Sequence, residues 1–142
     1  MRTLLIGALI GAIGLGAWVY VGPREKTGAG GQTPGTGAEM VAVTLPALTG
    51  EAALGANAFA GLCAACHGPN AGGIDGAGPP LVHRIYEPGH HGDGAFLRAA
   101  RQGVRSHHWP FGDMPPVEGA TDADIRAIIA YVRAVQMENG IF

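Results

Sequence analysis

The sequence predicts an all-α domain of about three main helices joined by loops rich in glycine and proline. Two observations support this fold class. Apolar residues recur at helical spacing in three separate stretches, and no stretch shows the alternating pattern of a β-strand. The segments between these stretches are rich in Gly and Pro, which favour turns and loops.

Composition divides the 142-residue chain into three segments. Residues 1–22 are almost wholly apolar, and residues 23–39 are dominated by Gly, Pro and Thr, which predicts a flexible linker. Residues 40–142 have the mixed composition of a folded domain, with six arginines, no lysine and nine acids, a formal charge of −3. Because no basic face is clustered there, we expect no nucleic-acid partner.

The apolar run Leu4–Val21 favours a membrane-anchoring helix. As a helix, its 18 residues would span about 27 Å, close to the ~30 Å hydrocarbon thickness of a bilayer. Trp18 and Tyr20 lie at its end, where aromatic rings prefer the interface. A cleaved signal peptide is the alternative, because the run is only moderately hydrophobic, although no clear cleavage site follows it.

Three helical stretches follow the linker. The first runs from Thr49 to Cys66, and its apolar side carries Leu54, Ala58, Phe59 and Leu62. The second is capped by Asp93 and is expected to turn inward Phe96, Leu97, Ala100 and Val104. The last begins with a capping box of Thr121 and Asp124, and its apolar residues at helical spacing are Ile125, Ile128, Ile129, Val132 and Val135.

The two cysteines of the chain occur together in Cys63-Ala64-Ala65-Cys66-His67. A C-x-x-C-H motif predicts covalent attachment of one haem c, with both thiols on one side of a helix end and the imidazole under the iron. A redox-active cysteine pair or a disulfide would leave the histidine unexplained. A zinc site would need further ligands at suitable spacing.

From about Gly50 to the C-terminus the chain resembles the class I cytochrome c family. Gly78-Pro79-Pro80-Leu81 is similar to the family's G-P-x-L segment, about twelve residues after the motif histidine. The resemblance implies the cytochrome c fold around one haem, with His67 as an iron ligand. It also implies that the Pro79 carbonyl accepts a hydrogen bond from His67 Nδ1, and that Leu81 lies beside the haem.

The same resemblance suggests the second iron ligand. Met114 lies in Trp109-Pro110-Phe111-Gly112-Asp113-Met114-Pro115-Pro116, which is similar to the family's axial methionine loop. A thioether opposite an imidazole raises the reduction potential of the iron. Met114 could instead only pack in the core. Its rivals, Met40 and Met137, lie beside the linker and near the end of the last helix. Trp109 is expected to contact the haem edge or a propionate.

Histidines outside the motif have less certain roles. His107 and His108 could replace Met114 as an iron ligand, hydrogen-bond a propionate or face solvent, and we favour the last two. His90 and His91 follow a predicted turn, and the sequence assigns them no role.

The family also implies a crossing of the first and last helices. Gly55 and Phe59 stand eight and four residues before the first cysteine, where the family has a small residue and an aromatic. Ile128 and Tyr131 match their usual partners on the last helix. Without the resemblance, all four would simply be core residues.

The leading functional hypothesis is a single-electron carrier and not an enzyme, because His/Met ligation leaves no open position on the iron. The resemblance implies transfer between respiratory or dehydrogenase partners, such as a quinol-oxidising complex and a terminal oxidase. It also implies a haem domain on the periplasmic, outer side of the cytoplasmic membrane. A five-coordinate haem with peroxidase-like or gas-sensing activity is the alternative, and a fixed subunit of a larger complex is a third possibility.

Overall fold

The computed structural model describes residues 38–142. The segment predicted as a membrane anchor or signal peptide, residues 1–22, and all but the last two residues of the predicted linker lie outside the described part. Within residues 38–142, no helix combines the length and the apolar character needed to cross a membrane.

The all-α prediction is confirmed for the described residues. Four α-helices and one short 3-10 helix follow the chain in this order: α1 (Gly50–Leu62), α2 (Ala64–His67), η1 (Arg84–Tyr86), α3 (Asp93–Gln102) and α4 (Asp122–Glu138). Extended pairing in this part of the chain is limited to isolated bridges in the loops. The loops are therefore held by individual hydrogen bonds and by packing on the helices.

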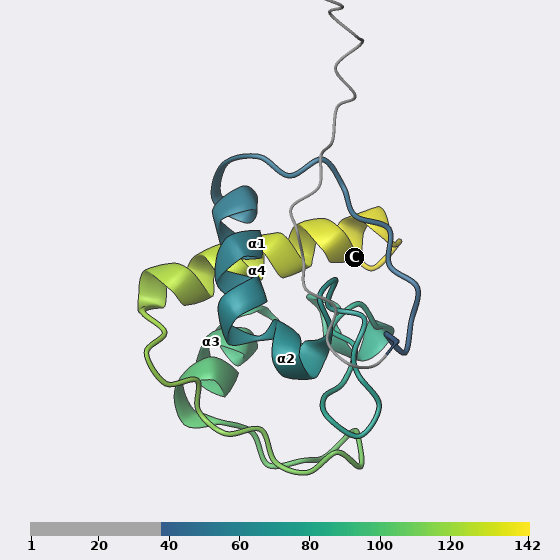
Figure 1. Cartoon of the computed structure of the whole chain (residues 1–142), viewed down its shortest axis with the longest axis vertical. Helices are drawn as coiled ribbons and strands as arrows, with labels where there is room; N and C mark the ends of the chain where they lie inside the picture. Colours follow the sequence, from purple (N-terminus) through teal and green to yellow (C-terminus); the bar gives the residue numbers. More distant parts are fainter. Residues whose placement is uncertain (1–37) are drawn as a thin grey trace, which may run out of the picture.

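The crossing of α1 over α4 forms the centre of the fold (Figure 1). A Cβ atom at Gly55 would lie 1.8 Å from the Ala127 carbonyl oxygen, so only glycine allows the two backbones to approach this closely. One turn further along α1, the rings of Phe59 and Tyr131 pack with their centroids 5.1 Å apart. The crossing pair implied by the family resemblance is therefore confirmed.

The first predicted helix needs two corrections. It is not continuous from Thr49 to Cys66, because the backbone leaves helical geometry at Cys63, which separates α1 from α2. Leu54 and Leu62 are also not core residues, since they are 66% and 37% exposed. A steep crossing covers only the part of α1 that contacts α4, so the residues on its flanks stay at the surface.

The second predicted helix is shorter than expected, whereas the last matches its prediction. Gly92, not Asp93, is the N-cap of α3, and Val104 lies beyond the end of that helix. The Thr121 hydroxyl accepts a hydrogen bond from the Asp124 N–H at 3.2 Å, and Asp124 Oδ2 accepts one from the Thr121 N–H at 2.9 Å. The capping box is therefore confirmed.

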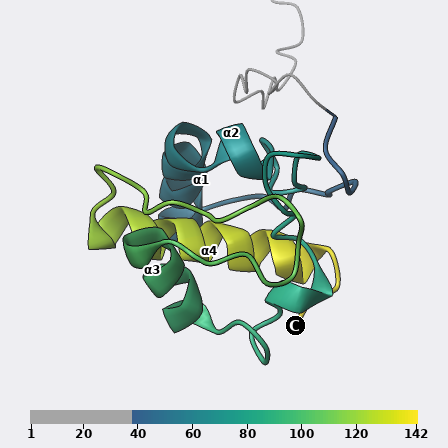
Figure 2. The same ribbon diagram turned by 90° about the horizontal axis from the view of Figure 1, so that it is seen from below.

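Helix α4 joins the two halves of the domain. It lies between α1 and α3, contacting both, while α1 and α3 occupy opposite sides of it (Figure 2). Its buried side continues the core through Ile128, Val132 and Val135. Because α4 contacts every other long helix, it fixes the distance between the Cys63–His67 turn and the loops that follow α3.

Candidate functional site

The turn that carries the cysteine motif is fixed by its own backbone. The Cys63 N–H donates to the Phe59 carbonyl at 2.9 Å, and the Cys63 carbonyl accepts from the N–H groups of Cys66 and His67 at 3.2 and 3.0 Å. These hydrogen bonds span the interruption at Cys63 between α1 and α2. They keep the cysteine motif close to the core residue Phe59.

The two cysteines are free thiols in different surroundings. Cys63 is partly buried, and burial raises the pKa of its thiol to about 11, with a further contribution from the charge of Cys66. Cys66 is exposed.

The His67 side chain is buried and is held in one orientation by a hydrogen bond. It is 9% exposed, and its Nδ1 hydrogen-bonds the Pro79 carbonyl at 2.9 Å, as the family resemblance implies. Burial lowers the pKa of His67, although the hydrogen bond to Pro79 acts in the opposite direction. In the neutral imidazole that this burial favours, Nδ1 is the protonated nitrogen and Nε2 keeps its lone pair for a metal.

Close backbone contacts place the segment that holds His67. A Cβ atom at Gly78 would lie 2.7 Å from the Cys66 carbonyl oxygen, so this glycine allows Pro79 to reach the imidazole. The carbonyl of Ala71, a buried residue at φ 63°, accepts hydrogen bonds from the N–H groups of Leu81 and Val82. The role of Ala71 could not be read from its residue type, because alanine seldom adopts a positive φ.

A segment before α1 closes over the same turn. The Glu39 carboxylate accepts hydrogen bonds from the N–H groups of Asn70 and Gly72 and from the Asn70 side chain, at 2.7 to 3.1 Å. Met40 N–H donates to the Gly73 carbonyl at 3.0 Å. Sequence reasoning placed Glu39 in the linker and missed this contact, since a single acid beside a Gly-rich stretch gives no such signal.

Met114 lies on a loop fixed by one pair of hydrogen bonds. Its N–H and carbonyl both pair with Val104 at 2.9 Å, so the two arms of the loop run side by side (Figure 1). Gly103, at φ 74°, ends α3 next to this pair, and a Cβ atom there would lie 2.5 Å from the Met114 carbonyl oxygen. The Asp113 carboxylate accepts a hydrogen bond from the Ser106 N–H at 2.8 Å, which is a second link between the two arms of the loop.

One mostly apolar cavity of about 550 Å³ brings most of the predicted site residues together. Its lining includes Cys63, His67, Pro79, Leu81, Trp109 and Met114. Cys66 does not line the cavity, although it belongs to the same turn. The rival methionines, Met40 and Met137, do not line it either and are 38% and 61% exposed.

The cavity fits an amphipathic prosthetic group. Its walls are largely aliphatic and aromatic, yet the buried Trp109 Nε1–H lacks a hydrogen-bond partner among the described residues. Burial raises the pKa of Tyr86, and the nearby indole N–H opposes this effect without reaching hydrogen-bond geometry. The Trp109 ring stacks on Phe111 at 5.8 Å, which fixes the direction of its N–H. A buried donor without an acceptor is rare and is explained by a polar edge of a bound group.

Two residues of α4 hold the wall between η1 and α3, and sequence reasoning missed both. The Gln136 side chain is fully buried and donates to the carbonyls of Leu81 and Tyr86 at 2.8 and 3.0 Å. Arg133 donates to Asp93 Oδ1 at 2.8 Å and to the Tyr86 carbonyl at 2.7 Å. Gln136 follows Val132 by four residues and Arg133 follows Ile129 by four, so polar residues on the apolar side of the helical pattern are the signal that could have pointed to them, although not to their partners.

Three of the remaining histidines line one part of the cavity. His107 and His108 are exposed, and together with His91 they belong to its lining. His83 lies elsewhere, with its ring edge-on to Trp109 at 5.3 Å. The structure thus brings all the predicted haem residues except Cys66 to one cavity, and it places histidines beside them in its lining.

Comparison with known proteins gives one match. The model of the family described as Cytochrome c matches residues 52–136, which is more than half of the chain. No curated protein and no solved structure matches the chain.

Proposed function

Because the chain belongs to the cytochrome c family, whose members carry covalently bound haem c and transfer electrons, we propose that it is a mono-haem electron carrier. Cys63 and Cys66 would form the thioether links to the haem. His67 and Met114 would coordinate the haem iron, and Leu81 and Trp109 would contact the haem itself.

The observation that carries the proposal is that His67 and Met114, far apart in the sequence, line one cavity. Both residues are held in place by hydrogen bonds to backbone groups. The Pro79 carbonyl holds the imidazole in one plane, and the pair with Val104 holds the methionine loop. Residues held in this way need little rearrangement when the charge at the site changes. A bound haem supplies the one-electron chemistry, and a thioether opposite an imidazole favours its reduced form.

We further propose that the domain works at the outer face of the cytoplasmic membrane. The sequence of residues 1–22 supports a single membrane-spanning helix, and residues 23–39 support a flexible tether. A tethered domain meets membrane neighbours at high effective concentration. Its partners would be respiratory or dehydrogenase complexes, such as a quinol-oxidising complex as donor and a terminal oxidase as acceptor.

Carbon monoxide binding tests the electron-carrier proposal. The full chain, produced in a host with c-type haem maturation, is reduced and exposed to carbon monoxide while its absorption spectrum is recorded. A haem with two protein ligands keeps its spectrum. Rapid carbon monoxide binding by the unaltered chain would contradict the proposal and favour the five-coordinate alternative, with peroxidase-like or gas-sensing chemistry.

Fractionation of the same cells tests the location. Haem staining of a full-length band in alkali-washed membranes is the expected result, because a spanning helix resists extraction. A shorter haem-stained band in the soluble periplasmic fraction would overturn the anchor and leave residues 1–22 as a cleaved signal peptide.

A further inference from the structure

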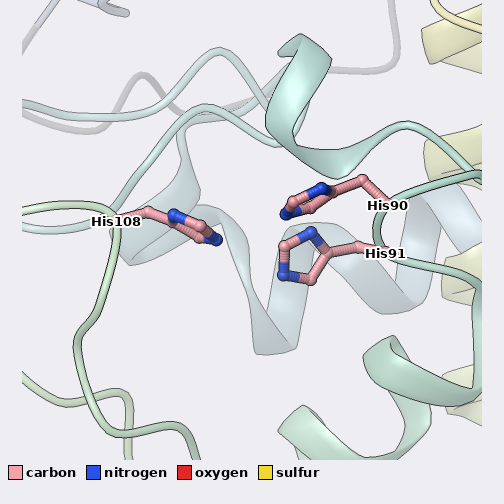
Figure 3. Close-up of side chains that lie close together, drawn as sticks. All are labelled: His90, His91 and His108. Carbon is pink, nitrogen blue, oxygen red and sulfur yellow. The ribbon is translucent and has the colours of Figure 1, made fainter.

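Three neighbouring histidines, two of which (His91 and His108) line the cavity, form a group that the proposed electron transfer does not use. His90 and His91 come from the turn before α3, and His108 comes from the loop that carries Met114. Their rings point toward one another from the two sides (Figure 3). One ring nitrogen of each lies within 4.8 Å of the others. We propose that these three residues bind one divalent transition-metal ion, separate from the haem iron.

The spacing of the rings suits a single ion. The centroids of His91 and His108 are 5.3 Å apart, those of His90 and His91 are 4.6 Å apart, and those of His90 and His108 are 5.6 Å apart. Zinc–nitrogen bonds of about 2.0–2.1 Å place tetrahedral ligand atoms roughly 3.4 Å apart. The nitrogens therefore need to approach one another by about 1.4 Å at most, which side-chain rotation can supply because two of the three residues are at the surface.

His91 is already oriented as a metal ligand. Its Nδ1 hydrogen-bonds the Ile85 carbonyl, which leaves Nε2 as the ring nitrogen available to a metal. Its backbone carbonyl accepts a hydrogen bond from Arg133, which ties this part of the turn to α4. Ligand histidines in proteins usually hold their second nitrogen on a carbonyl or carboxylate in this way.

The donor set selects the class of ion. All three donors are imidazole nitrogens, and neither ion pair in the described part of the chain involves a histidine. Imidazole nitrogen binds Zn²⁺, Cu²⁺ and Ni²⁺ well, whereas Ca²⁺ and Mg²⁺ require oxygen ligands. His107 lies beside the group, with its ring 4.2 Å from that of His108 and 6.1 Å from that of His91, but it does not belong to the set of three whose nitrogens lie within 4.8 Å of one another.

An ion at this position would connect the turn before α3, which carries His90 and His91, to the loop after α3, which carries His108. One end of the link is the turn tied to α4 by Arg133, and the other is the loop bearing Met114. A bound ion would therefore hold the methionine loop against the turn that precedes α3. This consequence rests on the proposed function, whereas binding of the ion itself does not.

Calorimetric titration with Zn²⁺ tests the site. The sample is the haem-loaded full chain with any affinity tag removed, and Zn²⁺ is chosen because it has no redox chemistry with haem. We expect one Zn²⁺ per chain. His91→Ala and His108→Ala should each weaken binding at least tenfold, since each removes one of three ligands. His83→Asn is the matched control, because it removes a histidine outside the group and keeps a side-chain acceptor for the Ile85 N–H.

Two results would overturn the site: no Zn²⁺ binding by the unaltered chain in the micromolar range, or unchanged binding by a His90→Ala/His108→Ala variant. A third result would also overturn it: the alanine variants shift the reduction potential but bind Zn²⁺ as tightly as the unaltered chain does, which would assign the rings to a propionate and not to the ion. The haem spectrum, recorded alongside, shows that each variant is folded. The same spectrum would show whether His67 and Met114 fail to ligate the iron, and such a failure would not change the interpretation of the Zn²⁺ titration.

Discussion

The two sides of the cavity are built by different means. On the His67 side, a buried imidazole is held by Pro79, the turn around it is closed by Glu39, and the supporting helix crosses α4 through Gly55. On the Met114 side, an exposed loop is held by one backbone pair with Val104 and by a side-chain contact from Asp113.

The difference indicates separate tasks for the two sides. The His67 side combines burial with several independent hydrogen bonds, so its geometry is set by the folding of the helices. The Met114 side has few buried contacts and depends on a short loop, which is the kind of segment that opens locally at low cost in free energy. Changes on the first side should therefore affect folding, and changes on the second should affect ligation with the fold retained.

The largest effect is expected at Gly55. Gly55→Ala would place a Cβ atom 1.8 Å from the Ala127 carbonyl oxygen and force α1 away from α4. We expect a loss of at least about 3 kcal/mol in the free energy of unfolding, measured by denaturant titration, or failure to accumulate folded protein. Gly61→Ala is the control on the same helix, because a Cβ atom there meets nothing within 4 Å. Equal stability of the two variants would contradict the close crossing.

The next effect separates ligation from folding. Gly103→Ala would introduce a side chain at φ 74° and a Cβ atom 2.5 Å from the Met114 carbonyl oxygen. We expect a cost of about 2–3 kcal/mol and displacement of the methionine, seen as loss of the Met–Fe(III) charge-transfer band while haem stays attached.

Gly112→Ala controls for backbone strain alone in the same loop. Gly112 also has a positive φ, 88°, but a Cβ atom there meets nothing within 4 Å. This variant should lose about 1 kcal/mol in the free energy of unfolding and keep the band. Loss of the band in both variants would show that backbone strain alone displaces the methionine. The close contact between residue 103 and the Met114 carbonyl would then not be the cause.

Alkaline pH should weaken the His67 side through Tyr131. Burial, with the added charge of Glu39, raises the pKa of Tyr131 from 10.0 to about 12. The unfolded chain loses this proton first, so the stabilisation is complete below pH 10 and is lost as the pH rises toward 12. We expect the free energy of unfolding to fall by about 2 kcal/mol over that interval. Tyr131→Phe should remove most of the decrease, and an unchanged pH profile would contradict the assignment.

The smallest effect concerns the start of α4, where the chain returns from the methionine loop. Thr121→Ala removes the hydroxyl that accepts from the Asp124 N–H and should cost about 1 kcal/mol in the free energy of unfolding. Thr121→Ser keeps the acceptor and should cost little. An equal loss for serine and alanine would show that the methyl group, which both variants lack, and not the hydroxyl cap, is important.

The parts predicted from sequence are those specified by local patterns or by the family motif. The capping box, the Gly55–Tyr131 crossing region and the hydrogen bond between His67 and Pro79 belong to this group. The break at Cys63 and the exposure of Leu54 were not predicted, because periodicity shows an apolar side without showing how much of it a neighbour covers. Glu39 and Gln136 were missed since their partners lie more than thirty residues away.

The most direct test of the account is the ferric absorption spectrum of the haem-loaded chain and of Met114→Ala. The account predicts the Met–Fe(III) charge-transfer band in the unaltered chain and its loss in the variant, with haem still attached through Cys63 and Cys66. Met137→Ala, which changes an exposed methionine at the end of α4, should keep the band. Absence of the band from the unaltered chain, or its persistence in Met114→Ala, would contradict His67/Met114 ligation. It would also contradict an electron carrier whose iron has no open coordination position.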